Sequence, residues 1–322
     1  MRRLFVPLIL LVILAGTAGL GWWQVNRAWS GPGPLAQEVT LVVPRGGASA
    51  IADTLAERGV VGQPLVFLAA AWITTADGPL RAAEFTFPAR ASLRDVFEIL
   101  RRGRPVQRRL TIPEGFNARQ IAALLERTEG LTGELPVLVE GAVLPETYAY
   151  QFGETRTALL RRATAAMDQA LAEIWAGRAP NLPLASPREA LILASIVEKE
   201  TGRADERGRV AGVFINRLRR GMMLQSDPTT AYAAADGGVL DRPLTRADLD
   251  RDHPFNTYRI RGLPPGPIAS PGRDALRAVA RPDATEMLFF VADGTGGHAF
   301  ARTLEEHNRN VARWREIERG RR

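Results

Sequence analysis

The chain has 322 residues, of which 46% are hydrophobic, and its formal net charge at pH 7 is +7. This length can bury a core and favours two domains preceded by an anchor. Because the sequence contains no cysteine, disulfides, thiolate nucleophiles, thiolate zinc sites and iron–sulfur clusters are excluded. The positive charge suits an anionic membrane surface or wall polymer, but no dense basic stripe with interleaved aromatic residues indicates nucleic acid.

An apolar segment near the amino terminus predicts a membrane anchor. Residues 4–21 form a run of 18 uncharged residues, just long enough to span a bilayer, and Trp22 and Trp23 follow at the depth of the membrane interface. Two arginines precede the run and one follows it, which favours a cytoplasmic amino terminus. A cleaved signal peptide is the alternative, disfavoured because no clean small-x-small cleavage site follows the run.

These features predict a single-pass protein of the inner (plasma) membrane. We expect residues 1–3 to be a cytoplasmic end, residues 4–23 a transmembrane helix and residues 24–38 a linker. The rest of the chain is then expected in the periplasm or otherwise outside the membrane.

The region after the linker alternates between strand and helix patterns. In chain order we expect a strand at residues 39–44, a helix at 48–58, a helix from Pro64, a strand at 83–88 and a helix from the N-cap Ser92 to Leu100. Residues 41–46 and 110–115 form a weak repeat, each reading as a strand with a Pro–Gly turn before a helix. Chance similarity is the alternative explanation.

The second half of the chain predicts helices first and loops later. We expect helices at residues 158–175, from Pro187 to about Gly202 and at 210–220, then a loop-rich region after Gly221, a strand at 287–293 and a basic terminal helix. Within that loop-rich region, Asp227 before Pro228 is typical of a turn.

The only lysine of the chain, Lys199, lies between Glu198 and Glu200, directly after the apolar run of residues 191–197. Successive helix positions turn by about 100°, so the two carboxylates point to different faces and do not form a close pair. A carboxyl at the end of an apolar face is partly desolvated, which favours its neutral form and makes it a candidate general acid. The spacing slightly favours Glu200; the alternative is that both are ordinary surface carboxylates at a helix end.

Other residue types give weaker signals. Ser195 lacks the flanking glycines of a nucleophile elbow, which disfavours a serine hydrolase. His253, His298 and His307 lack metal-ligand spacing, so we expect neither a metal nor a cofactor.

Six motifs follow one another along the second half of the chain. They are Leu193-Ala-Ser-Ile-Val-Glu-Lys-Glu-Thr201, Val213-Phe-Ile-Asn-Arg-Leu218, Leu224-Gln-Ser-Asp-Pro-Thr229, Asn256-Thr-Tyr258, Gly262-Leu-Pro-Pro-Gly-Pro-Ile-Ala269 and Phe290-Val-Ala-Asp-Gly294. In this order they closely resemble the endolytic murein transglycosylase family (MltG, or YceG-like). The resemblance covers roughly residues 107–320, and a further motif at residues 140–148 has Leu144 where the family usually has an aromatic residue.

The resemblance implies an α+β fold made of a membrane anchor helix, a small LysM-like α/β domain at residues 39–106 and a mixed α+β YceG-like catalytic domain at residues 107–322. Glycan binding by the LysM-like domain is a looser expectation. The implied activity is endolytic cleavage of the MurNAc–GlcNAc β-1,4 bond of nascent peptidoglycan without water, which leaves 1,6-anhydro-MurNAc ends and terminates glycan elongation. Penicillin-binding peptidoglycan synthases are the implied partners. A hydrolytic muramidase using Asp227 as second carboxylate and a non-catalytic glycan-binding scaffold are the alternatives.

The resemblance also assigns site residues. Glu200 is the implied catalytic acid and base. Because a cation beside a general acid lowers its pKa, we expect Lys199 to pair with another acid or face the anionic wall and not to touch Glu200. Loop capping is the alternative role for the polar residues of the motifs. The implied substrate-binding residues are Glu198, Lys199, Asn216, Gln225, Asp227, Thr229, Asn256, Tyr258 and Glu146.

Overall fold

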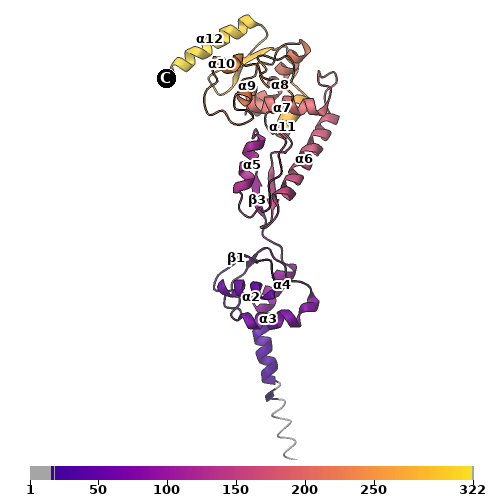
Figure 1. The fold of residues 1–322 in the computed structure, drawn as a ribbon, viewed down its shortest axis with the longest axis vertical. Coiled ribbons are helices and arrows are strands. Elements are labelled where there is room, and N and C mark those ends of the chain that lie inside the picture. The colour runs from indigo at the N-terminus through magenta and orange to yellow at the C-terminus, as the bar shows by residue number, and fades with distance from the viewer. Residues whose placement is uncertain (1–15, 18, 321–322) are drawn as a thin grey trace, which may run out of the picture. The chain divides into compact units, whose positions relative to one another are not determined.

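The computed structural model describes residues 16, 17 and 19–320 (Figure 1). The chain divides into two compact units. The first ends at Arg108 and also takes in Tyr150–Gly153, while the second holds Arg109–Ala149 and the chain from Glu154 onward. The two units are described separately below.

The predicted transmembrane helix at residues 4–23 and the cytoplasmic end lie largely outside the described residues. Residues 19–30 are helical, so a helix continues into the first part of the predicted linker. Among the residues that the structure describes, no helix has both the length and the apolar character needed to cross a bilayer.

The first unit is a two-stranded antiparallel sheet packed with helices. Val39 lies opposite Phe87 in the sheet. Phe67 and Phe97 stack at 4.7 Å between ring centroids in the core, and Ser92 caps its helix as predicted. Its elements are β1 (Val39–Val42), α2 (Ala48–Glu57), α3 (Pro64–Ile73), the short 3-10 helix η1 (Thr75–Asp77), β2 (Glu84–Phe87) and α4 (Leu93–Arg102).

The second unit is mainly helical, with two small sheets formed by the strand pairs β3–β4 and β5–β6. The predicted α+β class is therefore confirmed. From the unit boundary onward the elements are β3 (Arg108–Thr111), α5 (Ala118–Arg127), β4 (Thr147–Tyr150), α6 (Arg156–Ala176), α7 (Pro187–Glu200), α8 (Ala204–Arg219), α9 (Asp227–Ala234), α10 (Arg246–Asp250), α11 (Arg273–Ala280), β5 (Phe289–Ala292), β6 (His298–Ala301) and α12 (Leu304–Gly320).

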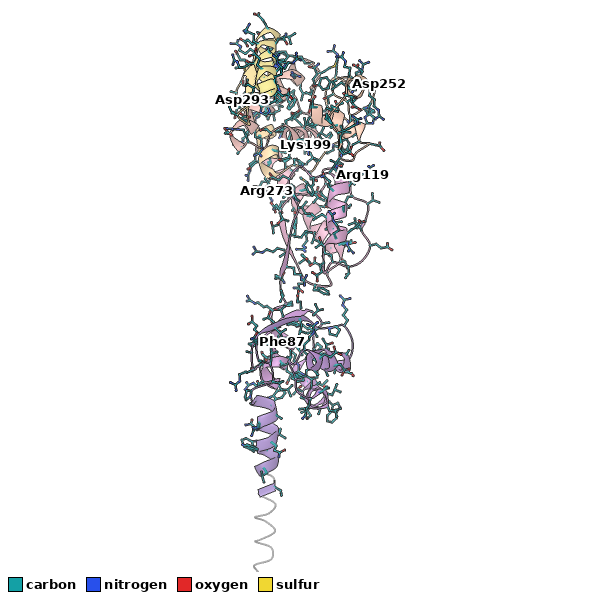
Figure 2. All side chains as sticks on the ribbon, turned by 90° about the vertical axis from the view of Figure 1, so that its left-hand side faces the viewer. Phe87, Arg119, Lys199, Asp252, Arg273 and Asp293 are labelled. Carbon is teal, nitrogen blue, oxygen red and sulfur yellow. The ribbon has the colours of Figure 1, made fainter. Side chains whose placement is uncertain are left out.

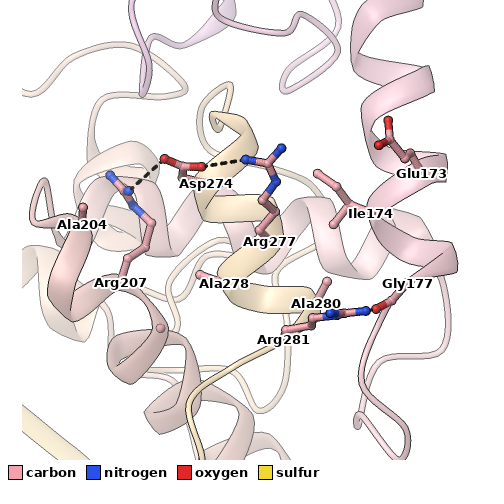
Figure 3. A pocket seen from close by; sticks show the side chains of 11 residues that line it. Glu173, Ile174, Gly177, Ala204, Arg207, Asp274, Arg277, Ala278, Ala280 and Arg281 are labelled. Atoms are coloured by element: carbon pink, nitrogen blue, oxygen red, sulfur yellow. Dashed lines mark hydrogen bonds and ion pairs between the residues drawn. The ribbon is translucent and has the colours of Figure 1, made fainter.

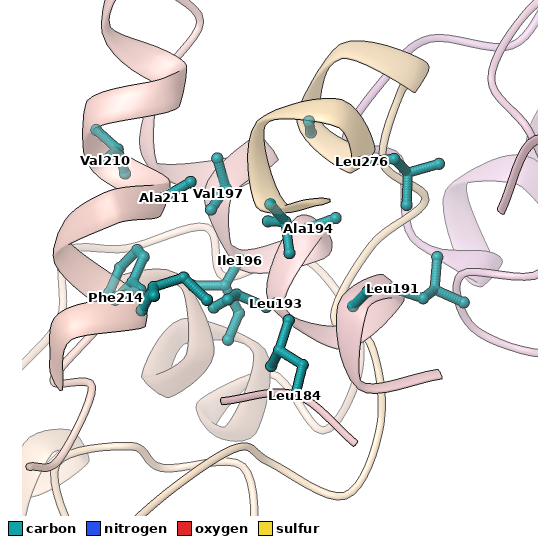
Figure 4. Close-up of a cluster of buried hydrophobic side chains, with 14 of the residues drawn as sticks. Leu184, Leu191, Leu193, Ala194, Ile196, Val197, Val210, Ala211, Phe214 and Leu276 are labelled. Carbon is teal, nitrogen blue, oxygen red and sulfur yellow. The ribbon is translucent and has the colours of Figure 1, made fainter. Parts of the chain in front are cut away.

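Helix α7 is the centre of the second unit. All eight residues from Ala190 to Val197 are buried, and α6, α8, α9 and α11 pack around them (Figures 1 and 4). A helix that is apolar on every side belongs in the middle of a core. Ser186 caps its first turn by accepting a hydrogen bond from Glu189 N, and Pro187 occupies the first helical position, where no amide hydrogen is needed. The rigid, buried helix therefore fixes where the charged residues at its C-terminal end point.

Three features of the sequence prediction differ from the structure. Asp227 begins α9 and does not form an isolated turn, because Pro228 is compatible with the first turn of a helix. The region expected to be loops also contains α10 and α11, and α11 buries Ala275, Leu276 and Val279 against the core. Helix α8 begins at Ala204, six residues earlier than expected, with acidic residues in its first turn that favour the helix dipole.

Candidate active site at the end of helix α7

The C-terminal turn of α7 directs three charged side chains toward three separate segments. Lys199 is exposed, whereas Glu198 and Glu200 are partly exposed. Because helix positions turn by about 100° each, neighbours diverge, and residues two apart lie about 200° apart. Each of the three side chains contacts a different part of the chain.

Glu200 contacts the segment just before α9. Ser226 Oγ donates a hydrogen bond of 2.5 Å to Glu200 Oε1, and Oε2 has no hydrogen-bond partner among the described residues. Burial raises the pKa of Glu200 to about 7; the negative charge of Asp227 adds to the rise, while the Ser226 hydrogen bond and Arg217 oppose it. A carboxyl with this pKa keeps its proton over much of the neutral range, as a general acid requires.

Ser226 is held by a buried hydroxyl network. Its amide donates to Thr257 Oγ1 at 2.9 Å, and its carbonyl accepts from Thr229 Oγ1 at 2.7 Å. The hydroxyls of Thr229 and Thr257 also lie 2.8 Å apart. Thr229, a predicted substrate contact, is fully buried and uses its hydroxyl within this network. The network fixes the serine that faces the candidate acid.

Arg217 connects several segments beneath this site, and the sequence analysis did not select it. It is 7% exposed, and its Nη1 donates to Leu224 O at 2.8 Å and to Gln225 Oε1 at 3.4 Å. Gln225 has a φ of 50°, a left-handed conformation uncommon for a residue other than glycine. Its place within the motif Val213–Leu218, after three apolar residues and one asparagine, was the available signal.

Asp227 and Tyr258 form the exposed edge of the site. The Tyr258 hydroxyl donates a hydrogen bond of 2.7 Å to Asp227 Oδ1. Asp227 is exposed and acts electrostatically on Glu200, since its charge raises the pKa of that carboxyl. The structure thus brings Glu200, Gln225, Asp227, Thr229 and Tyr258 into one neighbourhood.

The two asparagines predicted to contact substrate are engaged within the protein. Asn256 is fully buried; its Nδ2 donates to Arg251 O at 2.8 Å and its Oδ1 accepts from Thr230 Oγ1 at 2.9 Å. Asn216 Nδ2 donates to Thr285 O at 2.7 Å. These contacts favour the loop-capping role for both residues.

Glu198 lies on the opposite side of the α7 turn, near the start of α11. Its Oε2 accepts a hydrogen bond of 2.9 Å from the amide of Gly272. Burial raises the pKa of Glu198, and the negative charge of Glu114 adds to that effect. The Glu114 carboxylate packs directly against Gly272, where a Cβ would require that side chain to move. Glu146, another predicted substrate contact, pairs with Arg273 Nε at 2.8 Å in the first turn of the same helix.

Lys199, which is labelled in Figure 2, contacts the turn before α5. Its Nζ donates to Gly115 O at 3.4 Å, and it borders a cavity of about 350 Å³ together with Asp227 and Tyr232. In the part of the chain that the structure describes, Lys199 forms no ion pair, either with Glu200 or with another acid. The separation from Glu200 agrees with the prediction, whereas the alternative of pairing with another acid does not.

Glu140 is a third partly buried carboxyl, and the sequence did not lead us to select it. It accepts hydrogen bonds from Ala118 N at 3.0 Å, in the first turn of α5, and from the Tyr232 hydroxyl at 3.2 Å. Burial raises its pKa. Its place at the start of the motif at residues 140–148 was the available signal.

Within the described residues none of the three histidines hydrogen-bonds to Glu200, and each has a different partner. His253 Nδ1 accepts from Phe255 N at 3.1 Å, His298 Nδ1 lies 2.8 Å from a carboxylate oxygen of Glu206, and His307 stacks on a phenylalanine ring. Within the described residues no three potential metal-ligating side chains of the His, Cys, Asp and Glu types gather.

Comparison with known proteins identifies the family. The model of the YceG-like family matches residues 41–313. The chain belongs to the YceG-like family. The match begins well before residue 107, so the family region also includes most of the first unit, which the sequence motifs did not reveal.

Relatives and a solved structure agree with this assignment. An endolytic murein transglycosylase of Streptococcus pneumoniae (strain D39) is 32% identical over 85% of this chain and 58% of its own length. One from Bacillus subtilis is 37% identical over 53% of this chain and 46% of its own length. The chain therefore spans only about half the length of these curated relatives. A crystal structure from Listeria monocytogenes, described as a yceG-like protein, is 26% identical with a TM-score of 0.52, over 85% of this chain and 99% of that chain.

Proposed function

We propose that this protein is an endolytic peptidoglycan lytic transglycosylase with Glu200 as its catalytic acid and base. The observation that carries the proposal is the carboxyl of Glu200, whose pKa burial raises to about 7 and whose Oε2 has no protein partner among the described residues. The relatives named endolytic murein transglycosylase support the same reaction class.

The proposed reaction cleaves the β-1,4 bond between MurNAc and GlcNAc in two proton transfers. Protonated Glu200 gives its proton to the glycosidic oxygen as the C1–O bond breaks. The resulting carboxylate then takes the proton of the C6 hydroxyl of the same MurNAc, whose oxygen forms the new bond to C1. The products are a free C4 hydroxyl on the leaving sugar and a 1,6-anhydro-MurNAc end, and Glu200 is again protonated.

Ser226 suits both halves of this cycle. Its hydroxyl donates to the carboxylate form of Glu200, and the same hydroxyl can rotate to accept a hydrogen bond from the protonated form. One carboxyl that changes its protonation state is sufficient here, whereas hydrolytic glycosidases use two carboxyls.

A hydrolytic muramidase is the second candidate, and Asp227 is the observation that favours it. Asp227 is an exposed carboxylate near enough to raise the pKa of Glu200. In that reaction Asp227 would activate water or stabilise the sugar cation.

Digestion of purified peptidoglycan by the full chain distinguishes these reactions, with mass spectrometry of the released ends. We expect anhydro-MurNAc ends. Reducing MurNAc ends would establish the muramidase instead, and unchanged glycan would indicate a non-catalytic scaffold.

We also propose that the protein acts at the membrane on nascent strands, so that its cuts terminate glycan elongation beside penicillin-binding synthases. The apolar run at residues 4–21 and the interface tryptophans support a cytoplasmic amino terminus with both units outside the membrane. Protease added to intact spheroplasts should degrade the residues after the anchor; protection of both units would contradict this topology.

A further inference from the structure

A second pocket lies between three helices of the second unit, apart from the contacts of Glu200. It has a volume of about 540 Å³ and is bordered by the C-terminal end of α6, the first turns of α8, and α11 (Figure 3). Three arginines line it, namely Arg207, Arg277 and Arg281, together with the acids Glu173 and Asp274.

Arg207 is the unusual member of this pocket. The residue is 8% exposed, yet its guanidinium makes no hydrogen bond with any described residue, and its buried Nε has no partner. Its nearest carboxylate oxygen, on Asp274, is 3.9 Å from Nη1. Asp274 contacts Arg277 more closely, at 3.1 Å. Buried guanidinium groups normally have every N–H hydrogen-bonded, so one that borders a cavity with a single long ion pair and no hydrogen bond indicates room for a further anionic partner.

The charge and shape of the pocket define that partner. Three arginines and two acids leave one net positive charge, which suits a single carboxylate better than a doubly charged phosphate group. Between the charged groups the lining is small and apolar, including Ile174, Ala204 and Ala278. A carboxylate next to a methyl group, as at the D-alanine end of a peptidoglycan stem peptide, has both features.

We propose that this pocket binds the terminal D-alanine carboxylate of a murein stem peptide, with Arg207 as its main contact. The inference rests on the proposed function, since it takes murein as the substrate. Arg207 acts electrostatically on Glu198, whereas Ser226 bonds Glu200, and neither Glu200 nor Ser226 lines the pocket. The pocket is thus a second recognition site that reads the peptide while the Glu200 site acts on the glycan.

Calorimetric titration of the full chain in detergent tests the proposal without requiring glycan cleavage. The probes are a stem tetrapeptide with a free D-alanine carboxylate, the same peptide as its C-terminal amide, and inorganic pyrophosphate. We expect the free acid to bind at least tenfold more tightly than the amide, because a charge-assisted hydrogen bond is lost. Equal affinity of acid and amide, or preferential binding of pyrophosphate, would overturn the proposal.

Substitutions of the lining arginines test whether the peptide binds in this pocket. Arg207→Met and the double variant Arg277→Gln with Arg281→Gln should each weaken binding of the free acid about tenfold or more. Arg209→Gln is the matched control, because Arg209 is on the same helix but packs on Phe300 outside the pocket. Unchanged binding in Arg207→Met would contradict the assignment.

Thermal unfolding separates a ligand contact from a structural arginine. Arg207→Met should keep or raise the melting temperature of the peptide-free protein, because it removes a buried guanidinium that has no hydrogen bond and only a long ion pair. A lower melting temperature together with normal peptide binding would show that Arg207 is structural. Since free peptide carries no glycosidic bond, a failure of the proposed cleavage would leave peptide binding measurable, so the two proposals fail separately.

Discussion

The two sides of the C-terminal turn of α7 place similar carboxyls in different surroundings. Burial raises the pKa of both Glu198 and Glu200, so desolvation by itself does not distinguish them. The two carboxyls differ in the groups that donate hydrogen bonds to them. Glu200 receives a hydroxyl from Ser226, whereas Glu198 receives the backbone amide of Gly272. A hydroxyl can serve both the charged and the neutral carboxyl, but an amide only donates and so favours the charged form.

The largest expected effect separates these two carboxyls. Glu200→Gln should lower the cleavage rate about 10²–10⁴-fold, because general acid catalysis contributes on that order. Glu198→Gln is the matched control on the same turn and should retain most of the activity. The rate of release of glycan ends from purified peptidoglycan measures both; a dead Glu198→Gln with an active Glu200→Gln would reverse the assignment.

The Glu200→Gln variant, which should lose activity, should gain stability as the pH rises. Because the folded-state pKa of Glu200 is raised from 4.5 to about 7, stability from its neutral form is present below pH 4.5 and is lost as pH rises through 7. Relative to wild type, Glu200→Gln should therefore gain about 3 kcal/mol of unfolding free energy between pH 4 and pH 8. Urea unfolding at both values measures the gain, and an equal difference at both would contradict the raised pKa.

The next effect is on the free energy of unfolding, and it compares the loops around Ser226 with those around Glu198. Asn256→Ala should lower the free energy of unfolding by about 2–3 kcal/mol, because buried hydrogen-bond partners lose their contacts. On the Glu198 side, Glu146→Gln should cost less than about 1 kcal/mol, since its ion pair with Arg273 is exposed. Chemical denaturation compares the two; a stable Asn256→Ala with impaired substrate binding would make Asn256 a substrate contact.

The pH profile tests the neighbours of Glu200 individually. The acid must be protonated to start the reaction, so the rate should fall as pH rises through about 7. We call this fall in rate the alkaline limb of the pH profile. Ser226→Ala removes a hydrogen bond that lowers the pKa of Glu200, so it should move the limb to higher pH. Asp227→Asn removes a negative charge that raises the same pKa, so it should move the limb to lower pH. Shifts in the same direction would show that Glu200 does not control the limb.

The smallest effect is expected at Lys199, between the two carboxyls. Lys199 is exposed and makes a single long hydrogen bond to Gly115, so Lys199→Met should change the free energy of unfolding by less than about 0.5 kcal/mol. The pH limb should also stay in place, because Lys199 makes no contact with Glu200. A shifted limb would show that the charged triplet acts as one unit.

The sequence by itself determined the local structure and the likeness to the family. The continuous apolar run before Glu198 predicted α7, and the strand patterns predicted β1 and β2, because apolar spacing reports which faces of an element are buried. The motifs around Glu200 also identified the family, whose model matches residues 41–313.

Only the tertiary structure decided how those motifs are arranged. The serine that bonds Glu200 lies 26 positions away, and Arg207 forms its ion pair with Asp274 from another helix. Periodicity within one segment carries no information on such long-range contacts, and α9 and α11 were missed because prolines and glycines around them are typical of loops. The sequence supplied the carboxyls, while burial and partners from distant segments set the pKa of each.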